Sequence, residues 1–232
     1  MSDPQNKQRD ILDLLLTKGG MKQDVYVRLQ EVFLDMKGVL EELAGGLEKQ
    51  LLERDPRVTV RFRDKGQMAC ELQAAGDVVI FHMHTNVFLL DQSHSLWRSS
   101  YLEEDATRGY FGVVNMYNFL NDSFKFNRMQ DLGYLVARLL VNREGHFLVQ
   151  GKRQLGFLFN DLAGSVLDRP AMEEVLHQVL LHVIDFDLLA PPYDHVSQVT
   201  VQEMNHLNDN LSLRTGKRMG FRFHDEEEGP QA

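Results

Sequence analysis

Two histidines one residue apart are the feature of this sequence best suited to chemistry. His82 and His84 lie within residues 78–86, an apolar run that predicts a buried strand. Because successive side chains of a strand point to opposite faces, the two imidazoles share one face. Neighbouring imidazoles can supply half of a metal's ligands or line a polar pocket. His82 and His84 are therefore candidate ligand-binding residues and weak candidates for metal ligands.

A metal site at this pair would need at least one more ligand. Asp91 and His94 follow in the chain, and His146 is expected on a strand of the same sheet. The simpler interpretation is that both imidazoles are hydrogen-bonded on a half-exposed sheet face. The sequence also lacks the common glycine-rich phosphate loops, the Gly-x-Ser-x-Gly motif and the His-Glu-x-x-His motif. We therefore predict no metal and no cofactor, and we assign no catalytic residue.

A second group of candidates combines aromatic, amide and arginine side chains. It begins in the polar stretch 91–108 and continues on the strand expected after it. Ligand sites join aromatic walls to a few aimed polar groups, so this group could line a cleft that the polar stretch gates. The alternative is an aromatic core with polar edges. The candidate ligand-binding residues of this group are Trp97, Arg98, Arg108, Tyr110, Asn115 and Tyr117.

The composition is that of a globular chain with enough apolar residues for a core. Of 232 residues, 43% are hydrophobic and 25% are charged, which is the ordinary range. Cys70 is the only cysteine, so a buried structural thiol in a reducing compartment is expected. The first residues show no signal-peptide pattern, and no apolar run approaches the ~20 residues of a membrane helix. These features predict a cytoplasmic protein without membrane association.

The net charge of −9 argues against binding to a nucleic-acid backbone, which requires positive charge. Two basic groups stand out against this balance. One lies on the strand expected at 57–65 and the other follows residue 213: Arg57, Arg61, Arg63 and Lys65, then Arg214, Lys217, Arg218 and Arg222. A charge-balanced surface is the expected role of both groups. Nucleic-acid association through strand 57–65 is the least favoured of three functions.

Helices are expected at the start of the chain. Residues 8–17 predict a short helix, which Gly19 and Gly20 would end. Residues 23–53 predict a long helix, because apolar residues recur there at three- and four-residue steps. This stripe approximates a heptad over several turns, which predicts a homodimer or another protein partner bound through helix 23–53. The sequence does not decide whether residues 1–54 pack on the sheet or project from it.

Residues 57–150 carry the pattern of a mostly antiparallel sheet. Strands are expected at 58–63, 68–73, 78–88, 110–117 and 146–149. Short turns join the first three strands, which predicts an antiparallel meander. Residues 131–141 are apolar on both faces and fit either a strand or a helix.

The last third of the chain returns to helical patterns. Helices are expected at 152–167, from Pro170 and from Thr200, followed by an edge strand at 219–223. Residues 225–232 predict an acidic disordered tail. The sequence thus predicts one α+β domain over residues 1–224, with a helical segment at 8–54, a sheet region at 57–150 and helices at 152–213 packed on one side.

This order of elements is similar to the general layout of ligand-sensing domains of the PAS and GAF kind, although the sequence carries no motif of either family. The expected function is therefore that of a non-enzymatic module that binds a ligand or a protein partner. The alternative is a metal-assisted enzyme that uses His82 and His84.

Overall fold

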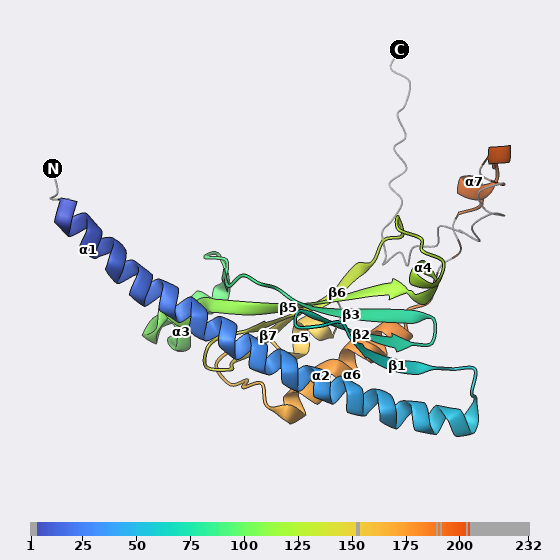
Figure 1. Ribbon diagram of the computed structural model, residues 1–232, viewed down its shortest axis with the longest axis horizontal. Coiled ribbons are helices and arrows are strands. Elements are labelled where there is room, and N and C mark those ends of the chain that lie inside the picture. Colours follow the sequence, from blue (N-terminus) through green and yellow to red (C-terminus); the bar gives the residue numbers. More distant parts are fainter. Residues whose placement is uncertain (1–3, 152–153, 189, 191, 203, 205–232) are drawn as a thin grey trace, which may run out of the picture.

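The computed structural model describes residues 4–151, 154–188, 190, 192–202 and 204. A seven-stranded antiparallel sheet forms its centre, and a very long N-terminal helix and a later helix pack against one face of the sheet (Figure 1). This arrangement confirms the predicted α+β fold with a long N-terminal helix. Among the described residues, no helix is both long enough and apolar enough to cross a membrane.

The sheet has the strand order β1-β2-β3-β5-β6-β7, and the short strand β4 pairs with β5. All neighbours are antiparallel, so the first three strands form the predicted meander. Residues 131–141, which the sequence allowed to be either a strand or a helix, contain the strand β6. The bounds are β1 (Val60–Asp64), β2 (Ala69–Ala74), β3 (Asp77–Met83), β4 (Phe88–Leu89), β5 (Tyr110–Leu120), β6 (Tyr134–Val141) and β7 (Phe147–Gly151).

One continuous helix opens the chain. It comprises α1 (Pro4–Leu14), a π-helical segment η1 (Leu15–Gly19) and α2 (Gly20–Arg54). The prediction that Gly19 and Gly20 end a helix is therefore wrong: both glycines have right-handed helical backbone angles. Glycine lowers helix propensity by about 1 kcal/mol but does not forbid a helical conformation.

The main core lies between α2 and the sheet. The apolar stripe of α2 is buried from Met21 to Ala44 and shares this core with α6 (Arg169–Ile184) and with six strands, β1, β2, β3, β5, β6 and β7. The apolar stripe, which we predicted to bind a partner, therefore packs on the sheet of the same chain. A partner role for helix 23–53 stays a prediction, and only its outward side, with Val27 and Leu34 exposed, is free to serve it.

A segment between β3 and β5 covers part of the opposite face of the sheet. The predicted polar stretch 91–108 contains three short helices: η2 (Ser95–Arg98), α3 (Ser100–Glu104) and η3 (Ala106–Gly109). They enclose a second apolar cluster, formed by Leu90, Leu102, Phe111, Val113, Leu140, Leu148 and Leu162. Leu140 and Leu148 are buried here while their strand neighbours face the main core, so this part of β6 and β7 is apolar on both faces.

The end of the chain differs most from the prediction. Instead of a helix over 152–167, only α5 (Leu155–Leu158) is helical, because residues 159–166 run back along β7. Val149 and Phe147 donate backbone hydrogen bonds to Phe159 and Ser165 (3.0 and 3.1 Å). The helix α6 begins as predicted, with the Asp168 side chain accepting from the backbone N–H of Ala171 at 2.9 Å.

Two further short helices complete the description, α4 (Asn121–Lys125) and α7 (Tyr193–Val196). Of the helix expected from Thr200, residues 201, 202 and 204 are described as helical. The edge strand expected at 219–223, the basic group that follows residue 213 and the acidic tail at 225–232 lie outside the described residues.

Candidate functional site

The two histidines lie on the face of the sheet opposite α2. His82 is exposed in β3, while its neighbours Phe81 and Met83 are buried in the main core. His84 follows the end of β3, where its Nδ1 accepts a hydrogen bond from the backbone N–H of Asn86 at 3.0 Å. Its ring also meets the ring of Phe88 edge-on, with 4.7 Å between centroids. The imidazole of His84 therefore stabilises the local turn.

The side chains considered as a third metal ligand have other partners. Asp91 accepts from Ser93 (2.8 and 2.6 Å), and His94 accepts from the backbone N–H of Leu96. His146 Nδ1 lies 2.8 Å from the carbonyl oxygen of Leu162. In the described part of the chain, no group of three or more His, Cys, Asp or Glu side chains lies close enough to hold a metal ion.

His82 begins a row of polar side chains that crosses the open face of the sheet. The strand register places it beside Asn115 of β5, Asn115 beside Arg138 of β6, and Arg138 beside Gln150 of β7. We call these four residues the polar row. Their strand neighbours Met116, Ala137, Leu139 and Val149 are buried in the main core, so the row points away from it.

The polar row contains two predicted site residues and two that were not predicted. Tyr117, opposite Ile80, lies on the same open face beside the row. Arg138 and Gln150 escaped prediction because nothing in the sequence says which strands become neighbours, or that β6 is a strand at all. The alternation of charged Arg138 with apolar Ala137 and Leu139 is the one signal that could have placed it.

Trp97 and Arg98 belong to the segment that covers the second apolar cluster. The indole Nε1 of Trp97 donates to the carbonyl of Asp91 at 2.9 Å. Its ring lies so close to Gly109 that an added Cβ there would be 2.4 Å from it. Trp97 therefore has a packing role, whereas Arg98 is exposed.

Arg108 belongs to a polar cluster at the turn between β6 and β7. Its Nε donates to Glu144 at 3.1 Å, its Nη1 donates to the carbonyl of Tyr101 at 2.9 Å, and its guanidinium lies 4.4 Å from the Tyr101 ring centroid. Tyr101 Oη donates to Glu144 at 3.0 Å. A second ion pair, Arg143 with Asp105 at 2.6 Å, joins the same turn to the covering segment.

Asn142 is the centre of this cluster and is fully buried. Its Nδ2 donates to Tyr101 Oη and to the carbonyl of Arg108 (3.0 and 3.3 Å). Its Oδ1 accepts from the backbone N–H groups of Glu144 and His146, both at 3.0 Å. We call Tyr101, Arg108, Asn142 and Glu144 the turn network.

The electrostatics of the turn network favour a structural role. Burial alone would raise the pKa of Glu144, but the hydrogen bonds from Arg108 and Tyr101 bring it below its ordinary value. Burial raises the pKa of the Tyr101 hydroxyl. A carboxylate of lowered pKa beside a permanent cation is a weak general base at neutral pH, so the network is better suited to fixing the turn than to proton transfer.

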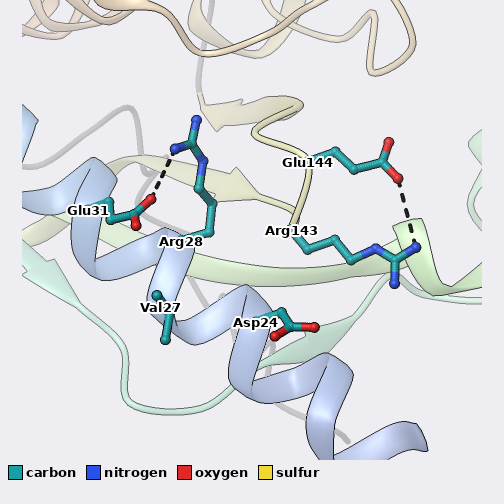
Figure 2. A pocket seen from close by; sticks show the side chains of 6 residues that line it. All are labelled: Asp24, Val27, Arg28, Glu31, Arg143 and Glu144. Carbon is teal, nitrogen blue, oxygen red and sulfur yellow. Dashed lines mark hydrogen bonds and ion pairs between the residues drawn. The ribbon is translucent and has the colours of Figure 1, made fainter.

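A shallow groove of about 390 Å³ lies between the turn and α2 (Figure 2). Figure 2 shows Arg28 directed toward Glu31, and Arg143 toward Glu144; these pairs are 3.1 and 3.8 Å apart. Asp24 and Val27 complete its lining. Because each arginine has an acidic neighbour, the groove offers no unpaired cation to an anionic ligand.

Tyr110 lies on the other face of the sheet from Asn115 and Tyr117. Two residues after it, Gly112 packs directly against Leu29 of α2, which places Tyr110 on the helix side. The ammonium groups of Lys18 and Lys22 each lie 6.0 Å from its ring centroid. The eight predicted site residues therefore do not all lie on one face of the sheet.

The N-terminal helix carries an apolar surface that the sequence did not assign to a function. Figure 1 shows α1 extending beyond the ends of the strands; we call residues 4–19, which comprise α1 and η1, the arm. Side chains of residues 6–18 are all exposed. Five large apolar side chains there are 55–67% exposed: Ile11, Leu12, Leu14, Leu15 and Leu16.

The basic strand offers less positive charge than its sequence suggests. Arg57 pairs with Asp55 at 2.7 Å, and Arg63 and Lys65 both pair with Glu71 (2.7 and 3.2 Å). These ion pairs leave Arg61 as the member of the group without a carboxylate partner among the described residues.

Comparison with known proteins gives no further guide to the site. No family model matches the chain, and neither a curated protein nor a solved structure matches it. We therefore infer the function from the surfaces of the described residues.

Proposed function

We propose that this chain is a non-enzymatic protein-interaction module and that the arm is its docking surface. The observation that supports the proposal is the exposure of five large apolar side chains within residues 11–16. Single exposed apolar residues are normal, but a contiguous apolar patch rimmed by polar residues marks an interaction site. The flanking residues Asp10, Asp13 and Lys18 supply such a rim.

The stability of the arm gives the same argument from another direction. The arm continues the packed helix α2, but most helical stability in proteins comes from packing of an apolar face. The apolar side chains of the arm have no such packing on the sheet, because those of residues 11–16 are exposed; the contact of the arm with the sheet is polar, the Lys18 ammonium lying 6.0 Å from the Tyr110 ring centroid. A partner that covers Ile11 and Leu15 would supply the missing contacts.

The groups best able to perform chemistry are engaged in structure, which supports a non-enzymatic role. His84 holds the turn at Asn86, and Glu144 is paired with Arg108. Burial raises the pKa of the Cys70 thiol to about 12, so a nucleophilic thiolate is scarce at neutral pH.

The polar row favours a second candidate function, the binding of a small ligand rich in acceptor oxygens. Arg138 provides a permanent cation, and Asn115 and Gln150 provide amide donors within the same row. Titration of the protein with inorganic phosphate should then shift the amide resonances of β3, β5 and β6, and Arg138→Ala should abolish the shifts. Unshifted resonances at millimolar phosphate would exclude this phosphate site.

In-cell photo-cross-linking tests the docking role of the arm. A benzophenone amino acid replaces Leu15 in one variant and Asp13, two residues away and on the opposite side of the helix, in the control. We expect one discrete adduct from position 15, none from position 13, and loss of the adduct when Leu12→Glu is added. Equal labelling from both positions, or none from position 15, would contradict the proposal.

A further inference from the structure

We infer that the partner of the arm is a second copy of this chain, bound antiparallel with the two arms crossing at Leu14. This inference rests on the proposed docking role of the arm and adds the identity and orientation of its occupant. It follows from the order of charged and apolar side chains along residues 10–18.

Asp10, Leu14 and Lys18 follow one another at four-residue steps, so they lie along one side of the helix. When two such helices run antiparallel about a two-fold axis at Leu14, Asp10 of each copy lies opposite Lys18 of the other. The axis thus generates two ion pairs of opposite charge. Between the two ion pairs, Leu14 contacts Leu14 of the second copy.

The same alignment matches the apolar side chains. Ile11 and Leu15, one turn apart, form the centre of the exposed apolar surface and interleave with the same residues of the second copy. On the side away from Leu14, Leu12 lies opposite Leu16 of the second copy, and this contact also occurs twice. All five exposed apolar side chains are used.

A parallel pair of arms would be less favourable. With Ile11 and Leu15 at the centre, a parallel pair places the Asp10–Leu14–Lys18 side of one copy against the Leu12–Leu16 side of the other, which leaves both charges without a partner. The charge order therefore selects the antiparallel arrangement, which is also the self-complementary contact expected of a two-fold dimer.

The area available is sufficient for a weak dimer. Burying a leucine or isoleucine side chain removes on the order of 100 Å² from water. The five apolar side chains of both copies then contribute roughly 1,000 Å², near the lower limit of specific interfaces. We expect a dimer that dissociates on dilution.

Charge reversal tests the pairing in the full-length chain. Sedimentation equilibrium should give twice the chain mass of 26.8 kDa. Asp10→Lys and Lys18→Asp should each weaken the dimer about tenfold, because two attractions become two repulsions. The double variant Asp10→Lys/Lys18→Asp should restore it. Asp13→Lys, the same charge change on the opposite side of the helix, should have little effect.

Introduced cysteines test the orientation, since the native Cys70 is fully buried. A mixture of Asp10→Cys and Lys18→Cys copies should form a disulfide-linked dimer, whereas neither variant alone should, because like positions are ~12 Å apart along the antiparallel pair. Cross-linking of each variant with itself would overturn the antiparallel arrangement. Thermal unfolding of each variant checks that the sheet domain is folded.

The outcomes separate this inference from the proposed function. A folded monomer at all concentrations would overturn the second copy as partner. A benzophenone adduct from position 15 with a different protein would overturn it too, yet would support the docking role of the arm. An adduct of two copies together with rescue by the double charge reversal supports both.

Discussion

The buried amide of Asn142 connects two segments of the chain that are far apart in sequence. It contributes hydrogen bonds to the covering segment through Tyr101 and Arg108, and to its own turn through Glu144 and His146. Its side chain uses both donor hydrogens and the acceptor oxygen, so no isosteric apolar residue can replace it.

Asn142→Ala should therefore destabilise the protein by about 2–4 kcal/mol, because several buried polar groups lose their partners at once. Urea denaturation measures the change. The matched control Asn115→Ala removes an amide from the open face and should change the unfolding free energy by less than ~0.5 kcal/mol. Equal effects of the two substitutions would show that the turn network is not a stabilising element.

Glu144 should make the stability of the protein depend on pH. Its pKa in the folded protein lies below its ordinary value of 4.5, so its stabilising effect is present above that value and is lost as the pH falls through the folded pKa. Glu144→Gln should thus be less stable than the wild type at pH 7, and the difference should vanish on acidification.

Urea denaturation between pH 7 and pH 3 measures this difference. The control Glu103→Gln, at an exposed position of α3, should leave the pH profile unchanged. A constant gap between wild type and Glu144→Gln across the range would mean that the ionised carboxylate is not the stabilising species.

At the scale of single elements, glycine has opposite roles in the helix and in the sheet. A Cβ added at Gly112 of β5 would lie 2.7 Å from Leu29 Cδ2, so the close approach of α2 to the sheet depends on this glycine. A Cβ added at Gly45 of α2 would meet nothing within 4 Å.

The same substitution should therefore have opposite effects at these two positions. Gly112→Ala should destabilise by about 1–3 kcal/mol through overpacking, and Gly45→Ala should stabilise by about 0.5–1 kcal/mol through helix propensity. Thermal unfolding of the two variants measures both changes in stability, a decrease for Gly112→Ala and an increase for Gly45→Ala. Stabilisation by Gly112→Ala would contradict the helix position.

Leucines of the long helix provide a second comparison within one element. Leu29 is completely buried, while Leu15 is 65% exposed. Leu29→Ala should cost about 2–5 kcal/mol, and Leu15→Ala, measured by urea denaturation at a concentration where the chain is monomeric, should cost less than ~0.5 kcal/mol. A large loss from Leu15→Ala would place the arm against the sheet.

The sequence predicted elements best where one periodicity dominates. The α2 stripe, the meander of β1 to β3 and the start of α6 at Pro170 all follow from such patterns. Residues 131–141 stayed ambiguous because β6 faces the main core with Leu139 and the second cluster with Leu140. The helix predicted over 152–167 failed because backbone pairing with β7 outweighs a helical pattern.

At the scale of the whole molecule, the predicted site residues separate because a sequence does not show sheet order. Asn115 and Tyr117 share the open face, whereas Tyr110 of the same strand faces α2. The sequence could not show which face α2 covers, or that Arg108 would pair with Glu144 36 residues away. The arm escaped assignment because its helix was expected to end at Gly19.

Hydrogen exchange of the arm at increasing protein concentration tests the central claim most directly. Amides of residues 25–44 should be protected at every concentration, because α2 is packed on the sheet. Amides of residues 8–18 should exchange rapidly in dilute solution and gain protection as the second copy covers them. Rapid exchange of the arm at all concentrations, with α2 protected, would contradict the pairing of arms.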